Sequence, residues 1–156
     1  MYIHLLLHDR LLNSGFACMC GSFRRTSRAL TQLYDQALRP LSRSPTQLTI
    51  LQVLSRAGEV SQGHLGEMLA MDSTSLTRTL AIMVGPRWIT ERRGKDRRER
   101  WLRLSSAGEE KLKGALPLWE KVQSRLRRQI GEQAWNNLLR LTLQVTDAIT
   151  TKGESL

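Results

Sequence analysis

Apolar residues recur at helical spacing in the stretch from residue 72 to residue 84. Leu76, Leu80 and Met83 stand at positions i, i+4 and i+7, which predicts a helix with one face packed against a core. Asp72 precedes the run and is an N-cap candidate, because its carboxylate can accept from the free backbone N–H groups of the first turn. Pro86 cannot continue a helix, so we expect this helix to end at about residue 83 or 84.

Similar signals predict five other helices, at about 23–38, from 45 to near 58, and at about 61–70, 106–130 and 132–150. Ser44 and Ser61 are N-cap candidates, and Pro45 suits the first helical position, where its missing N–H costs nothing. Ser105 or Ser106 can cap the long helix that follows. We therefore expect a mainly α (α+β) fold.

The only strand signals flank a run of charged residues. Residues 89–93 and 101–104 predict the two strands of a hairpin, and residues 94–100 form its basic loop. The order from residue 61 onward is thus helix, tight turn, helix and basic hairpin. At 156 residues, the chain has the length of one domain with a sizeable core.

The charge of the chain indicates the class of its binding partner. The chain has 24 Lys and Arg against 14 Asp and Glu, a formal net charge of +10, which favours a polyanion. Aromatic residues make up only 5%, so stacking of single-stranded bases is a poor fit. The sequence lacks a nucleophile elbow, a glycine-rich phosphate loop and a metal-ligand cluster, which argues against an enzyme and against a cofactor. No apolar run approaches the roughly 20 residues of a membrane helix, so we expect no membrane partner and a cytoplasmic protein.

Double-stranded DNA suits the residues that face away from the apolar stripe. Short hydroxyl side chains at a helix start, with an arginine one turn on, can reach base edges or phosphates in a major groove. Long cations on a projecting loop can follow phosphates or enter a narrow minor groove. Asp96 cannot bind phosphate, and we expect it to orient Arg98 by a bidentate pair. The candidate DNA-binding residues are Gln62, Ser73, Thr74, Ser75, Thr77, Arg78, Arg93, Lys95, Asp96, Arg97, Arg98 and Arg100.

With these residues in place, the sequence resembles the MarR family of winged helix-turn-helix regulators. The matching segments are 72–78, 88–93 and the run Asp96-Arg97-Arg98 that leads to 102–105. The resemblance implies a single domain over 21–150, with a winged-helix core at about 44–105 and dimerisation helices at about 21–39 and 106–150. Relatives commonly place a glycine directly before the apolar pair that opens the wing. Here Gly85 lies two residues early, so we expect the angle of the wing to differ from that of its relatives.

A homodimer is the expected assembly. The last helix is apolar on more than one side, so it needs a second partner beyond its own domain, and MarR-like proteins dimerise through their first and last helices. The alternative is a helix buried wholly in its own chain. The candidate interface residues are Trp135, Leu138, Leu139, Leu141, Val145 and Ile149. Two-fold symmetry would imply a pseudo-palindromic operator with half-sites roughly 10 base pairs apart.

For a repressor of this kind, the resemblance is compatible with two signals that would release it from DNA. The commoner MarR role is release from DNA by a small aromatic or phenolic ligand near the dimer interface. In the hydroperoxide-sensing branch a reactive cysteine precedes an arginine and a tyrosine of the first helix, a spacing that Cys20, Arg28 and Tyr34 match. The second tyrosine of that branch should fall near Pro45 and is absent. Cys20 is therefore the redox candidate.

Two further questions stay open on the sequence. Residues 1–20 are either a leader or an extension of the first helix. A sequence-neutral, architectural DNA-binding protein would need the same positive charge but not the polar face of the helix at 73–78. Comparing a specific operator with random DNA would separate that class from a regulator.

Overall fold

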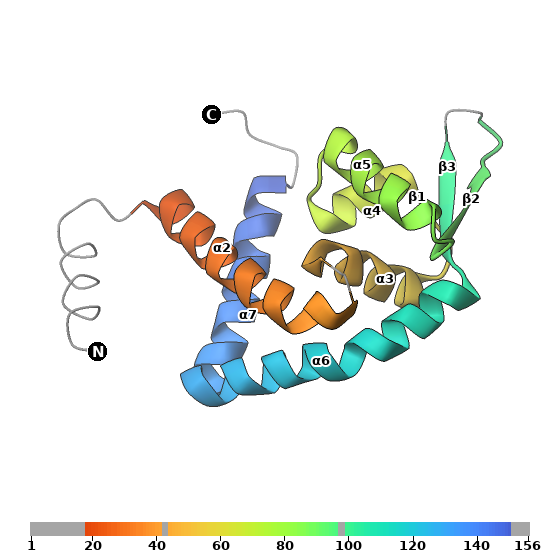
Figure 1. The fold of residues 1–156 in the computed structure, drawn as a ribbon. Coiled ribbons are helices and arrows are strands. Elements are labelled where there is room, and N and C mark those ends of the chain that lie inside the picture. Colours follow the sequence, from red (N-terminus) through yellow and green to blue (C-terminus); the bar gives the residue numbers. More distant parts are fainter. Residues whose placement is uncertain (1–17, 42–43, 97–98, 151–156) are drawn as a thin grey trace.

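The computed structural model describes residues 18–41, 44–96 and 99–150 and is mainly helical (Figure 1). Two helices, α3 (Pro45–Ala57) and α4 (Gln62–Leu69), lead to α5 (Ser73–Val84). The strands β2 (Ile89–Arg93) and β3 (Arg100–Leu104), with their connecting loop, form the wing. The helix α2 (Met19–Leu38) precedes this unit with a short 3-10 turn at Arg39–Leu41, and α6 (Ser106–Ile130) and α7 (Glu132–Thr150) follow it. The predicted mainly α (α+β) class is confirmed.

The sheet differs from the predicted hairpin by one strand. A short strand, β1 (Val60–Ser61), pairs antiparallel with β3, so the order is β1-β3-β2 with β3 in the centre. Val60 lies opposite Leu102, and Ser61 lies opposite Trp101. The prediction of two strands was therefore incomplete, since two residues are too few to show the alternation that marks a strand. This third strand fixes the wing to the entrance of α4.

The core lies under the helix-turn-helix unit and the sheet. Leu76, Leu80 and Met83 of α5 are each at most 1% exposed, which confirms the predicted inward stripe. They pack in one cluster with buried side chains from α3, α4, α6 and β3, including Leu51, Leu54, Leu65, Leu102 and Leu112. Because this face of α5 is anchored, its opposite face is free to carry function.

The predicted N-caps of α3 to α6 are confirmed by their hydrogen bonds, whereas α2 begins at Met19, four residues before the predicted start at 23. Ser44 accepts from the backbone N–H of Gln47 at 3.3 Å, and the Gln47 side chain accepts in return from the Ser44 N–H, which makes a capping box. Ser61 caps α4 through the His64 N–H, and Asp72 caps α5 through the Ser75 N–H at 2.8 Å. Ser105, rather than Ser106, caps α6.

The end of α5 shows what replaces the displaced glycine. The Arg87 N–H donates to the Val84 carbonyl at 2.9 Å, and the Trp88 N–H donates to the Met83 carbonyl at 3.0 Å. This is a Schellman pattern, and it puts Arg87 in the left-handed region with φ of 58°. Gly85 stays right-handed with φ of −50°. An arginine thus occupies the conformation that suits glycine, directly before the wing.

The wing is joined tightly to the start of α6. The Ser105 N–H donates to the Trp88 carbonyl at 3.1 Å, and the Ser105 hydroxyl donates to the Arg87 carbonyl. Gly108 sits so close to Trp88 that an added Cβ would overlap the Trp88 carbonyl oxygen. The entrance of the wing and the first turn of α6 are therefore held against each other by hydrogen bonds and close backbone packing.

Candidate nucleic-acid interface

The outward face of α5 carries four exposed polar side chains: Ser73, Thr74, Thr77 and Arg78. Ser75 is half-buried, and its carbonyl accepts from the Thr79 hydroxyl at 2.9 Å. The first turn of α5 thus carries small polar side chains, which suit a helix terminus that enters a major groove.

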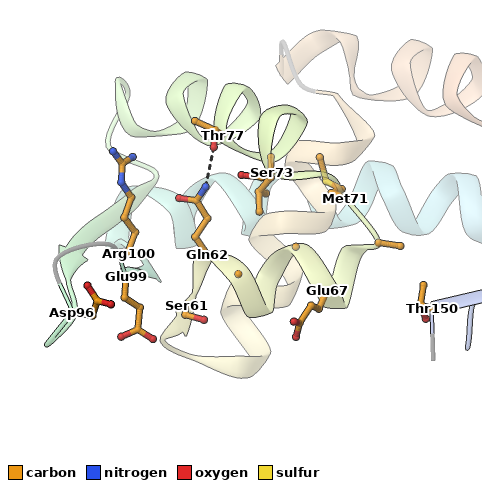
Figure 2. A pocket seen from close by; sticks show the side chains of 14 residues that line it. Ser61, Gln62, Glu67, Met71, Ser73, Thr77, Asp96, Glu99, Arg100 and Thr150 are labelled. Carbon is orange, nitrogen blue, oxygen red and sulfur yellow. Dashed lines mark hydrogen bonds between the residues drawn. The ribbon is translucent and has the colours of Figure 1, made fainter. Parts of the chain in front are cut away.

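Gln62 stands beside this face, at the start of α4. Its Nε2 donates to the Thr77 hydroxyl at 2.9 Å, which links two helices of the helix-turn-helix unit on their exposed side (Figure 2). The two residues are 15 positions apart in sequence. The sequence predicted Gln62 and Thr77 as DNA-binding candidates, but it did not predict the hydrogen bond between them.

The described cations of the wing are exposed. Arg93, Lys95 and Arg100 project from β2, the loop and β3. The loop is closed by the Gly94 N–H, which donates to the Glu99 carbonyl at 2.8 Å, and by the Glu99 N–H, which donates to the Asp96 carbonyl at 3.0 Å. The candidates Arg97 and Arg98 lie outside the described residues, so the expected pairing of Arg98 with Asp96 stays a prediction.

One wing arginine that the sequence analysis did not select has a structural role. Arg92 of β2 donates twice to the Glu59 carboxylate, and its guanidinium lies 5.1 Å from the centre of the Trp101 ring. These hydrogen bonds lower the pKa of Glu59 and raise that of Arg92. No local signal could have revealed the pair, because its members are 33 residues apart.

These elements border one open groove of about 1490 Å³. The groove runs between α4, the start of α5, the wing and the last residue of α7, Thr150 (Figure 2). Gln62, Ser73, Thr77 and Arg100 line it together with the carboxylates of Glu67, Asp96 and Glu99. Three of the described charged side chains in this lining are carboxylates and one is an arginine, so the exposed cations Arg93 and Lys95, which could meet phosphates, lie on the wing outside the groove.

The dimer candidates on α7 differ in how far they are exposed in the single chain. Leu138, Leu139, Leu141 and Ile149 are exposed in the single chain, with Leu139 at 48% and Ile149 at 77%. Val145 is half-buried. Trp135 is only 9% exposed, and Arg127 of its own chain lies over its ring at 5.4 Å. The burial of Trp135 thus needs no partner, whereas the four exposed residues leave an apolar face uncovered.

The residues of the redox hypothesis lie along α2. Cys18 and Cys20 are exposed, free thiols at its start. The Arg28 Nε donates to the Arg24 carbonyl at 3.3 Å, and partial burial raises the pKa of Tyr34. At about 1.5 Å rise per residue, Cys20 and Arg28 stand roughly 12 Å apart along the helix. One chain alone does not bring them together.

Within residues 18–41, 44–96 and 99–150, no group of three or more His, Cys, Asp or Glu side chains is placed to hold a metal ion. Over the same ranges, no helix is both long and apolar enough to cross a membrane.

Comparisons with known proteins agree on one class. Residues 41–99 match the model of the MarR family. A crystal structure of the transcriptional regulator MosR of M. tuberculosis in complex with DNA aligns with a TM-score of 0.78 and 30% identity, over 86% of this chain and 97% of that one. A mutant of MarR from E. coli with operator DNA has the same fold, with a TM-score of 0.73 and 19% identity over 81% of this chain and 92% of that one. The HTH-type transcriptional regulator YwoH of Bacillus subtilis, itself uncharacterized, is 24% identical over 123 residues, which cover 77% of this chain and 90% of YwoH.

Proposed function

This chain belongs to the MarR family of transcriptional regulators, and from that premise we propose that it is a repressor that binds a specific double-stranded DNA site as a homodimer. It is a regulator rather than an enzyme. The repression would be steric, because a bound dimer covers the promoter that contains its operator. MosR and MarR, both similar to this chain in fold, have been captured with DNA.

One observation carries the proposal. Ser73 and Thr77 of the exposed α5 face border the same groove as Arg100 of the wing, while the opposite face of α5 is locked into the core. A duplex laid against this groove would receive the start of α5 in its major groove and the wing along its backbone or minor groove. The formal net charge of +10 supports the approach of such a polyanion.

The homodimer supplies the symmetry of the operator. Leu138, Leu139 and Leu141 are exposed on α7, and Met19 and Phe23 are exposed on α2, so both terminal helices offer apolar surface. A two-fold dimer would present two copies of α5 to a pseudo-palindromic site with half-sites roughly 10 base pairs apart.

Release from DNA is assigned to a signal in the dimer region that changes the spacing of the two α5 helices. Two signals are proposed: a small aromatic or phenolic ligand, and oxidation of Cys20, whose thiol is exposed. Treating the DNA complex with salicylate or with an organic hydroperoxide separates them. Oxidative release should vanish in Cys20→Ser, whereas ligand-induced release should persist in that variant.

The experiment that tests the main proposal starts with selection from a randomised duplex library, which yields a selected duplex. Salt titrations then compare this duplex with random DNA. Arg78→Ala should weaken binding to the selected duplex by about 1–3 kcal/mol and to random DNA by less. Arg93→Ala, on the wing, should weaken both alike and flatten the salt dependence by about one unit. If the unaltered protein binds every duplex equally, it is the sequence-neutral binder and the repressor proposal falls.

A further inference from the structure

Thr77 is held differently from Thr79, which lies two residues further along α5. The Thr79 hydroxyl donates to the Ser75 carbonyl of its own helix at 2.9 Å, which is the usual resting arrangement for a helical threonine. The Thr77 hydroxyl instead accepts from the Gln62 Nε2 at 2.9 Å, and Thr77 is exposed beside the groove. The bond therefore fixes a hydroxyl and an amide next to each other where a duplex edge would lie.

Counting donors and acceptors shows what the pair offers outward. A hydroxyl has one O–H donor and two acceptor lone pairs, and an amide has one acceptor oxygen and two N–H donors. The Gln62 N–H occupies one lone pair of Thr77, so the Thr77 O–H must point away from that amide nitrogen. Within the described ranges neither this O–H nor the Gln62 Oε1 has a protein partner. The pair thus presents a donor beside an acceptor.

We propose that Gln62 and Thr77 together read one adenine in each half-site. The Thr77 O–H would donate to adenine N7, and the Gln62 Oε1 would accept from the adenine N6 amino group. Adenine shows this acceptor-and-donor pattern in the major groove, whereas guanine shows two acceptors, N7 and O6. Guanine would set its O6 against the Gln62 oxygen. The inference rests on the proposed function and adds the base that this site recognises.

The first test compares motifs selected from a randomised duplex library. The unaltered protein should enrich adenine at one position of each half-site. Thr77→Val and Gln62→Leu should both lose the preference at that same position and keep it elsewhere. Thr77→Ser, which keeps the hydroxyl, and the control Thr79→Val, whose hydroxyl serves its own helix, should retain the full motif.

The second test removes single atoms from the DNA. In the selected duplex that adenine is replaced by 7-deazaadenine, which lacks the N7 acceptor, or by purine, which lacks the amino group. Each change should weaken binding of the unaltered protein about two- to tenfold, the effect of one hydrogen bond. Thr77→Val should be insensitive to the first change, and Gln62→Leu to the second.

The outcomes separate the inference from the function beneath it. If no motif is enriched at all, sequence-specific binding is wrong and the inference falls with it. If a motif is enriched but the two variants relax different positions, or their shared position is guanine, only the adenine assignment falls. The base analogues are measured with the unaltered protein. This measurement therefore remains decisive even if a variant fails to fold.

Discussion

Arg92 holds Glu59 by two parallel hydrogen bonds, from Nε to Oε1 at 2.7 Å and from Nη2 to Oε2 at 2.5 Å. Glu59 directly precedes β1, Arg92 lies on β2, and the guanidinium also stacks over Trp101 of the central strand β3. One side chain therefore ties all three strands together near the loop end of the wing, one strand pair before Arg93 and Arg100. A bidentate carboxylate pair fixes direction as well as distance. Unlike Arg93, the exposed Arg92 pairs its charge with a carboxylate of its own chain.

Glu59→Gln should consequently weaken binding to the selected duplex, although it removes a negative charge from a DNA-binding protein. An amide offers Arg92 only one acceptor oxygen, so the wing should lose its fixed direction. Glu91→Gln, which removes the same charge from an exposed position on β2, is the matched control and should leave binding unchanged or tighten it. Fluorescence anisotropy titrations measure both. Equal tightening in the two variants would mean that Glu59 only repels phosphate.

Stability should fall in acid because two carboxylates have lowered pKa values in the folded chain. Arg92 lowers the pKa of Glu59, and the backbone N–H of Ser75 lowers that of Asp72. A folded pKa below the unfolded value, about 4 for such groups, adds stability that is present above about pH 4. This stability is lost as pH falls from there through the lowered folded value.

The Asp72 contribution can be isolated with Asp72→Asn. Asparagine caps a helix about as well as aspartate but does not titrate. Thermal unfolding measured from pH 7 to pH 3 should therefore show a shallower loss of melting temperature in the variant than in the unaltered protein. If the melting temperatures of the two proteins fell in parallel, Asp72 would not contribute to the loss of stability in acid.

Local signals account for most of what the sequence predicted. The caps at Ser44, Ser61 and Asp72 were predicted correctly because each donor lies three residues from its acceptor. The contact of Gly108 with Trp88 and the bond between Gln62 and Thr77 join residues 20 and 15 positions apart, so periodicity and capping rules carry no trace of them. The same holds for β1, which exists because β3 offers it a partner.

Gly85 is a feature whose consequence the sequence predicted only in part. The sequence showed that Gly85 was too early to end the helix in the family's way, and the structure shows the consequence at Arg87. The hydrogen bonds from Arg87 and Trp88 close the helix end, and the buried Trp88 packs in the same core cluster as Met83. Tertiary packing thus holds a non-glycine residue in the left-handed region.

Gly108→Ala should destabilise the fold by about 1–3 kcal/mol, the usual cost of overpacking. The new methyl group would overlap the Trp88 carbonyl, which belongs to the backbone and cannot rotate away. Gly114→Ala, six residues further along α6, is the control because nothing lies within 4 Å of its added Cβ. That variant should gain about 0.5–1 kcal/mol from better helix propensity. Urea unfolding measures the stability of both variants. If both lose stability, α6 does not tolerate alanine in place of glycine in general, and the contact with Trp88 is not the cause.

Ala70→Gly should stabilise the protein by about 1 kcal/mol. Ala70 ends α4 with φ of 48°, a left-handed conformation that costs a residue with a Cβ roughly 1–2 kcal/mol and glycine much less. Gly58→Ala tests the opposite case, since Gly58 has φ of 75° and an added Cβ there would meet strain rather than a neighbour. We expect it to destabilise by about 1 kcal/mol or more. Chemical unfolding that moves both variants in the same direction would contradict the conformational argument.

The apolar face of α7 should be covered by a second copy of the chain. Leu139 is 48% exposed and Val145 is half-buried in the single chain, so aspartate at both positions would place charge in the proposed interface while leaving the main core intact. The Leu139→Asp/Val145→Asp protein should run as a monomer or aggregate in size-exclusion chromatography with light scattering, and it should lose binding to the selected duplex.

The control for that variant adds the same kind of charge to α7 at a polar position. Asn137→Asp lies on the same helix and is exposed, so it should remain dimeric and bind the selected duplex with little change. Trp135 is a poor choice for this test, because its ring is already buried against its own chain and its loss would disturb folding. If the doubly substituted protein is a folded monomer with unaltered affinity for the selected duplex, the dimer plays no part in DNA binding. In that case each chain would have to recognise its half-site alone, and the expected two-fold symmetry of the operator would lose its cause.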